Sequence, residues 1–198
     1  PTKMQVAQGW RKDSLEKLLA DVVAWTGRVD IVMNCPGKNS TTPFFDLQMT
    51  EVDEILNVNL KSVIMACQVF AKRMIDQGEG GSIINISSAS SEKPLSKVFT
   101  YSASKAAVDN MTKFLAREFA PHKIRVNSIV PGFFPAEQNR KVLQPERVAK
   151  IMAQTPMNRF GEADELQGAA IFLASDKAAG FVTGATVAVD GGFGCMRL

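Results

Sequence analysis

A tyrosine and a lysine four residues apart have the types and spacing that most clearly allow chemistry in this sequence. Tyr101 and Lys105 fall near the start of a segment with a helical pattern, so their side chains project from one face. A free tyrosine has a pKa of about 10, and a nearby ammonium stabilises its phenolate. The pair can therefore act as a general acid/base that gives a proton to a carbonyl oxygen or takes it back from an alcohol.

Ser88 can complete this group, because it follows an apolar strand pattern and precedes Tyr101 by a short loop. Its hydroxyl can donate a hydrogen bond to the same oxygen while negative charge develops there. An isolated Tyr-x-x-x-Lys pair is more often a half-buried aromatic beside a solvated charge. On the spacing of the two residues alone, that structural interpretation stays open.

Strands and helices alternate along the chain and must position these residues. Short apolar runs predict buried strands, whereas longer stretches with apolar residues three and four apart predict helices. The alternation predicts an α/β fold, a doubly wound parallel sheet of the Rossmann type, in a single domain over 1–198. The predicted strands are 29–33, 82–86, 124–130 and 185–189, with a weaker candidate at 4–7; the predicted helices run from a cap at Asp13 to 26, from a cap at Thr50 to 76, over 98–119 and over 163–174.

Polar and turn-forming residues follow three of the predicted strands. In open parallel sheets the ligand crevice lies outside the carboxyl ends of the strands. Residues 34–37 follow one strand, Ser88 follows the next, and Pro131 with Gly132 follows a third. These segments should therefore meet at one edge of the sheet and form the binding site.

Composition excludes several other classes of protein. Apolar residues make up 45% and charged residues 22% of the chain, which is ordinary for a globular domain. A formal net charge of +3 without a long basic run gives no reason to expect nucleic acid. The lack of a long apolar run argues against a membrane span. Three widely spaced cysteines indicate a reducing, cytoplasmic location and no metal site; they are Cys35, Cys67 and Cys195.

The segments around these residues resemble the short-chain dehydrogenase/reductase family. The run 81–88, followed by Tyr101 and Lys105 at the spacing seen here, is similar to the active-site pattern of that family. The resemblance extends over nearly the whole chain and keeps the order of the family's motifs. The other similar segments are 34–37, 57–60, 124–132 and 182–192.

The resemblance implies an oxidoreductase that moves hydride between NAD or NADP and a ketone or secondary alcohol. It implies a fourth catalytic residue, Asn59, which in the family holds a water connected to the lysine. A buried asparagine can also simply cap local backbone groups, and that alternative stays open. The implied catalytic residues are Asn59, Ser88, Tyr101 and Lys105; the implied cofactor-binding residues are Asn34, Gly37, Tyr101, Lys105, Pro131, Gly132 and Phe134.

The family also begins with a strand, a glycine-rich phosphate turn and a second strand, and nothing similar precedes Pro1. The resemblance therefore predicts roughly two further βα units of about 30 residues each. In the family's strand order, their absence should expose strand edges in the middle of the sheet. Catalysis by the chain as it stands is thus left open.

Two segments resemble a subgroup of fructuronate reductases and D-mannonate oxidoreductases, which act on sugar acids. They are 131–140, PGFFPAEQNR, and 155–162, TPMNRFGE. Gln138 and Arg140, together with Ser88, could hold the hydroxyls and carboxylate of such a substrate. Arg140 could equally be a solvated charge. Two other functions stay open: reduction of another ketone, such as a 3-oxoacyl thioester, and a non-catalytic oligomerising scaffold.

The predicted helix over 50–76 is apolar on more than one side, which favours burial of a second face by a partner. The family commonly forms homodimers and homotetramers through its long helices, so the resemblance implies a homo-oligomer. The residues on this second face are Val58, Ile64, Met65 and Val69.

Overall fold

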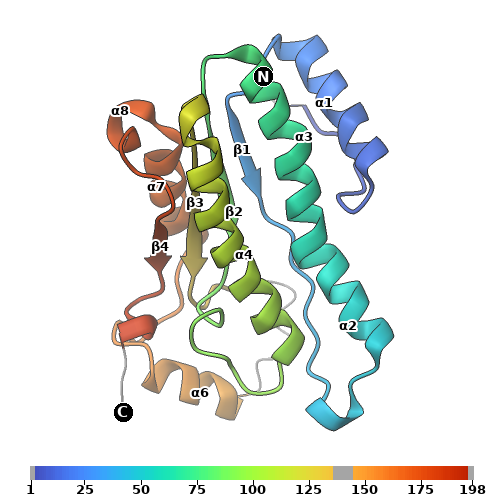
Figure 1. The fold of residues 1–198 in the computed structure, drawn as a ribbon. Helices are drawn as coiled ribbons and strands as arrows, with labels where there is room; N and C mark the ends of the chain where they lie inside the picture. The colour runs from blue at the N-terminus through green and yellow to red at the C-terminus, as the bar shows by residue number, and fades with distance from the viewer. Residues whose placement is uncertain (1–2, 136–144, 196–198) are drawn as a thin grey trace.

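Four parallel strands form the sheet in the computed structural model, which describes residues 3–135 and 145–195 (Figure 1). The strands lie in the order β1-β2-β3-β4, and each pairs in parallel with its neighbour. This arrangement confirms the predicted parallel α/β fold. The strands are β1 (Ile31–Asn34), β2 (Gly81–Ile86), β3 (Ile124–Pro131) and β4 (Thr186–Val189).

Helices cover both faces of the sheet. The side chains of Ile83 and Ile84, adjacent on β2, point to opposite faces, where each joins a different buried cluster. On the first face lie α1 (Lys12–Thr26), α3 (Ser62–Gln77) and α4 (Phe99–Phe119), and on the second lies α7 (Ala163–Ala174) with the short α8 (Asp176–Ala179) beside it. The remaining helices are η1 (Phe44–Asp46), α2 (Met49–Leu56), η3 (Ala120–His122), α6 (Pro145–Ala153) and η4 (Phe193–Cys195).

The predicted helix over 50–76 is a helical run interrupted by a π-helix. This segment, η2 (Asn57–Lys61), joins α2 to α3 and contains the buried Asn59. A π-turn inserts extra backbone into a helix and is common at functional sites. It changes the direction in which the side chains that follow project. The apolar pattern predicted the length of this run but not the interruption.

Several predicted boundaries are wrong in detail. Residues 4–7 form no strand, and Met4 and Val6 are fully exposed. Asp13 and Thr50 are not helix caps, because α1 and α2 begin before them, with Arg11 and Gln48 at the capping positions. Both lie in the first helical turn instead. Helix α6 was not predicted, whereas the bounds of α7 are as predicted.

The outer edge of β1 is not paired with another strand in the described part of the chain. Ile31 and Met33 on this strand are 53% and 43% exposed. A cavity of about 330 Å³ lies along the strand and is bounded by α1 and α3. The four strands pair with one another without a gap. The open strand edge therefore lies at β1, on the outside of this sheet, and not in its middle as the sequence predicts. The two further βα units stay a prediction.

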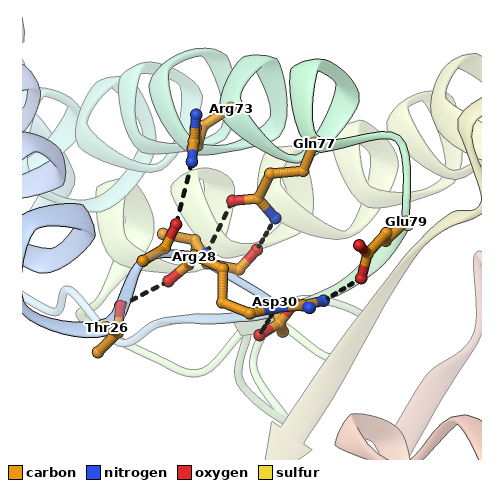
Figure 2. A network of polar contacts seen from close by, with 8 residues as sticks. Thr26, Arg28, Asp30, Arg73, Gln77 and Glu79 are labelled. Carbon is orange, nitrogen blue, oxygen red and sulfur yellow. Dashed lines mark hydrogen bonds and ion pairs between the residues drawn. The ribbon is translucent and has the colours of Figure 1, made fainter.

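A polar network fixes the amino end of β1 against α3 (Figure 2). The side-chain amide of Gln77 accepts a hydrogen bond from the Val29 backbone at 2.9 Å and donates one to its carbonyl at 2.8 Å. Arg28 forms ion pairs with Asp30 and Glu79, both at 2.7 Å. These contacts set where β1 begins and therefore where residues 34–37 emerge at its other end.

Part of the second face of the long helical run is covered within the chain itself. Val69 is buried and Met65 packs against the same cluster, which includes Leu15 of α1. Val58 and Ile64 are only partly buried, so the chain covers part of this face and burial of the rest by a partner stays a prediction. Within residues 3–135 and 145–195, no helix combines the length and apolar character required to cross a membrane.

Candidate active site

The structure brings Ser88, Tyr101 and Lys105 together at the carboxyl edge of the sheet. Ser88 lies just beyond the end of β2, and Tyr101 and Lys105 lie in the first two turns of α4. The side chains of Tyr101 and Ser88 lie close enough to interact, and the Ser88 hydroxyl favours the ionised form of Tyr101, which by itself lowers its pKa. The Ser88 hydroxyl also accepts hydrogen bonds from Ser90, from its backbone at 3.2 Å and from its hydroxyl at 3.1 Å. Two hydroxyls thus meet at one point, as the sequence predicts.

Lys105 is buried to 2% exposure and is held by two backbone carbonyls. Its ammonium donates to the carbonyl of Pro36 at 2.9 Å and to that of Ile86 at 2.8 Å. The Nζ atom lies 5.8 Å from the centroid of the Tyr101 ring. The lysine therefore ties α4 to the ends of β1 and β2 and places its positive charge beside the tyrosine.

The pKa of Tyr101 is raised, not lowered as the sequence interpretation expects. Burial of the ring and hydroxyl favours the neutral phenol, and the interaction with Ser88 only partly offsets this. The ammonium of Lys105 points at the two carbonyls rather than at the phenol oxygen. Tyr101 thus carries its proton at neutral pH, which suits it to act as a general acid.

Burial has the opposite effect on Lys105, because it penalises the charged form of an amine. It lowers the pKa of Lys105 to about 8, while electrostatic interactions with Cys35, where that thiol is ionised, and with the Asp109 carboxylate favour the charged form. At neutral pH the side chain remains mostly an ammonium. A modest loss of that stabilisation would nevertheless discharge it within the physiological range.

Asn59 is fully buried and makes three hydrogen bonds. Its amide oxygen accepts from the Lys38 backbone at 2.7 Å, and its amide nitrogen donates to the Lys38 carbonyl at 2.9 Å and to Ser104 Oγ at 3.0 Å. Two of these bonds join Asn59 to backbone groups, in agreement with the interpretation that a buried asparagine satisfies nearby backbone groups. They hold the loop after β1 against η2 and α4, beside Lys105. The water link implied by the family resemblance stays a prediction.

The residues predicted to contact a cofactor lie along the same edge of the sheet. Asn34 is buried and donates to Asn85 Oδ1 at 2.9 Å, whereas Gly37 is exposed in the loop beyond it. Gly132 follows Pro131 at the end of β3, and a Cβ atom there would lie 2.6 Å from the Cα of Asp190. The ring of Phe134 lies directly over Gly161. Gln138 and Arg140 lie outside the described residues.

Sequence reasoning missed two groups of charged residues near this edge. Asp109 is a buried carboxylate one turn after Lys105 on α4. Its position four residues from Lys105 was a usable signal, because that spacing places both on one helix face. Arg147 and Lys150 line a cavity between α6 and residues 94–96. They were missed because α6 itself was not predicted.

Comparisons with known proteins agree with this geometry. A model of the family described as Enoyl-(Acyl carrier protein) reductase matches residues 10–194. The 2-dehydro-3-deoxy-D-gluconate 5-dehydrogenase of Dickeya dadantii is 39% identical over 177 residues, which span 89% of this chain and 70% of that enzyme.

The chain belongs to the short-chain dehydrogenase/reductase family.

Membership confirms the predicted class of enzyme, a dehydrogenase/reductase. Two solved members illustrate the likeness. A gluconate 5-dehydrogenase from Burkholderia cenocepacia, in complex with NADP and tartrate, has a TM-score of 0.91 at 34% identity and covers 96% of this chain and 74% of its own. A D-mannonate oxidoreductase candidate from Haemophilus, with bound NAD, has a TM-score of 0.91 at 33% identity over 98% and 78%.

The depressed pKa of Lys105 predicts a specific pH dependence of stability. Unfolding restores the usual pKa of 10.5, so the unfolded state binds more protons between about pH 8 and 10.5. This contribution is complete above pH 10.5 and is lost as the pH falls through 8. Relative to Lys105→Met, the free energy of unfolding of the unaltered protein should rise by up to about 3 kcal/mol across that window, at about 1.4 kcal/mol per pH unit. Urea unfolding at a series of pH values measures this, and parallel profiles for the two proteins would contradict it.

Proposed function

We propose that this protein is an NAD(P)-dependent oxidoreductase that interconverts a ketone and a secondary alcohol on a sugar acid. The observation that carries the proposal is the meeting of Ser88, Tyr101 and Lys105 at the carboxyl edge of a parallel sheet, in a member of the short-chain dehydrogenase/reductase family. Parallel sheets bind their ligands at this edge.

The three side chains divide the work on the substrate oxygen. The Ser88 hydroxyl orients the carbonyl and donates to its oxygen as negative charge develops. Tyr101 transfers its phenolic proton to that oxygen in reduction and takes it back in oxidation. Lys105 carries a positive charge beside the ring and stabilises the phenolate left by that transfer. A bound nicotinamide dinucleotide supplies or accepts the hydride.

The donors of Lys105 fit such a cofactor. An ammonium has three N–H donors, and the carbonyls of Pro36 and Ile86 take two of them. The third has no acceptor among the described residues and suits a ribose hydroxyl. Together with Tyr101, the residues that would hold the nicotinamide end are Asn34, Gly37, Lys105, Pro131, Gly132 and Phe134.

A cavity of about 280 Å³ favours an anionic substrate. Arg147 and Lys150 of α6 line it from one side, and Phe133 and Phe193 form apolar wall. Arg147 donates to the Ser96 carbonyl at 3.3 Å, and neither cation has an acidic partner within the described part of the chain. Phe133 also packs with Ala89, the residue after Ser88, which relates this cavity to the reacting groups. A carboxylate is the substrate group that two such cations would bind.

The similar proteins support this substrate class. The Dickeya relative carries the name of a sugar-acid dehydrogenase, and the two solved relatives carry the names gluconate 5-dehydrogenase and D-mannonate oxidoreductase. Within the class we favour a fructuronate- or mannonate-like substrate. The second candidate is reduction of another ketone, such as a 3-oxoacyl thioester, because the description of the matching family model names an acyl carrier protein. A thioester carries no carboxylate for Arg147, so the two candidates differ in their need for it.

We also propose a homodimer or homotetramer formed through the long helices. Phe44 contacts both Phe45 and Phe99 edge to face near the start of α4, and all three rings remain exposed, Phe45 to 97%. Phe114 is exposed further along α4. Exposed aromatic residues grouped in this way are typical of a subunit interface.

Replacing Tyr101 tests the chemistry directly. Tyr101→Phe removes the proton donor but keeps the ring, so turnover should fall by roughly 10²- to 10⁴-fold with binding of NADH or NADPH unchanged. Stopped-flow turnover and fluorescence titration measure the two effects. Ser91→Ala is the matched control, since it removes a nearby buried hydroxyl that has no hydrogen-bond partner. Retained turnover in Tyr101→Phe would reject the proposed mechanism.

Replacing Arg147 tests the acidic substrate. Arg147→Ala should raise KM for D-mannonate at least about tenfold, the loss of roughly one charge-assisted hydrogen bond. It should leave KM for D-mannitol, the polyol without a carboxylate, unchanged. Arg117→Ala, on the exposed surface of α4, controls for net charge. Equal effects on the two substrates would exclude the carboxylate role of Arg147.

Replacing Phe114 tests the interface. Phe114→Glu places a charge in the proposed contact and should reduce the sedimentation coefficient to that of a smaller assembly. Phe181→Glu is the control, because Phe181 is fully exposed beside α8, on the other face of the sheet. The proposed interface is wrong if Phe114→Glu sediments like the unaltered protein, or if Phe181→Glu dissociates it equally.

A further inference from the structure

Asp109 is a buried carboxylate that no ion pair accounts for. Three charged side chains are buried within the described residues: Lys105 at 2%, Arg125 at 7% and Asp109 at 9% exposure. Arg125 pairs with Asp176 at 2.9 Å. Neither Lys105 nor Asp109 has an ion-pair partner within 4 Å in that part of the chain. Burying an isolated charge is costly, so something must compensate each of them.

Two serine hydroxyls supply part of the compensation for Asp109. Ser87, just after β2, donates to one carboxylate oxygen at 2.7 Å, and Ser128 on β3 donates to the other at 2.9 Å. The carboxylate is therefore held rigidly between α4 and two strands.

The same contacts connect Asp109 to Lys105. The two residues are one turn apart on α4 and both face the sheet, and the Ser87 hydroxyl lies 3.3 Å from the Lys105 carbonyl oxygen. In a low-dielectric interior, opposite charges interact over distances longer than a hydrogen bond. The two buried charges without ion pairs thus lie on one helix face with opposite sign.

We propose that Asp109 is a positioning residue for the reaction: its fixed negative charge keeps Lys105 protonated beside Tyr101, and its serine contacts hold that turn of α4 against the sheet. Its carboxylate is held by Ser87 and Ser128, so it acts through Lys105 rather than on the reacting atoms. The inference deepens the proposed function by giving the general acid/base group a third, indirect member.

The other groups around Lys105 do not supply this charge. From the loop after β1, Cys35 faces the ammonium, but burial raises the pKa of that thiol, so it is neutral at pH 7. From α4, Tyr101 keeps its proton, since burial raises its pKa as well. Lys113, four residues beyond Asp109, is exposed. Arg125 of β3 reaches α7 on the opposite face of the sheet.

The proposal fixes the sign of a pH effect. A negative charge near an amine raises its pKa, so removing the Asp109 charge should lower the pKa of Lys105 below its present value of about 8. In Asp109→Asn, which keeps the shape of the side chain, the titration midpoint of Lys105 should fall by about one pH unit. Lys105 would then lose its charge near neutral pH.

The measurement is the ¹³Cε chemical shift of Lys105 against pH, in protein with labelled lysine, with and without saturating NADH. Lys105→Arg assigns the signal by removing it. Ser128→Ala separates charge from docking, because it removes one contact of Asp109 but keeps its charge, and should leave the midpoint nearly unchanged. Asp76→Asn, an exposed carboxylate on α3, controls for net charge. An unchanged midpoint in Asp109→Asn, or an equal shift in Ser128→Ala, would overturn the proposal.

A second measurement needs no variant and decides the matter if Asp109→Asn does not fold. The ¹³Cγ shift of Asp109 in the unaltered protein should show an inflection at the midpoint of Lys105, because the discharge of the lysine changes the field at the carboxylate. The lack of that inflection would reject the coupling. Both measurements follow ionisation rather than turnover, so their failure is distinguishable from failure of the proposed enzyme activity.

Discussion

Two hydrogen bonds from one buried ammonium hold the candidate site together. Lys105 Nζ donates to the carbonyls of Pro36 and Ile86, which belong to the segments that leave β1 and β2. Where a strand leaves a sheet, its backbone carbonyls lose their hydrogen-bond partners on the neighbouring strand. One buried ammonium can donate to two such carbonyls at once. The lysine thereby closes the carboxyl edge of the sheet against α4. Tyr101, one turn earlier, is positioned as a consequence.

Burial at this edge shifts the pKa values of two neighbouring residues in opposite directions. Burial favours the neutral forms of both Tyr101 and Lys105, which leaves the phenol protonated and makes the ammonium only moderately stable. The site can release a proton from the tyrosine only if the lysine stays charged. The buried carboxylate of Asp109 resolves this conflict without entering the reaction, because it acts on the lysine through the helix and the two strands.

The sequence allowed prediction of features that depend on local pattern. The apolar periodicity of 163–174 and the spacing of Ser88, Tyr101 and Lys105 required no knowledge of distant contacts, and both predictions agree with the structure. The predictions that depend on tertiary contacts were wrong, or the features were not predicted at all. The direction of the Tyr101 pKa shift depends on how deeply the side chain is buried, which a periodic pattern does not encode. The apolar pattern also gave no sign of the π-helix at 57–61, which contains the buried Asn59.

Polar residues inside the sheet explain why burial patterns alone did not separate structural from functional residues. Asn34 donates to Asn85, and Asn85 donates to Thr112 of α4 at 2.9 Å, so these buried amides are paired within the protein. Their contacts stabilise the packing of α4 on the sheet. Lys105 differs, because one of its donors has no acceptor among the described residues. The free donor of Lys105 lies beside Tyr101 at the carboxyl edge of the sheet, and this combination of a free donor and its position suits the lysine to a ligand.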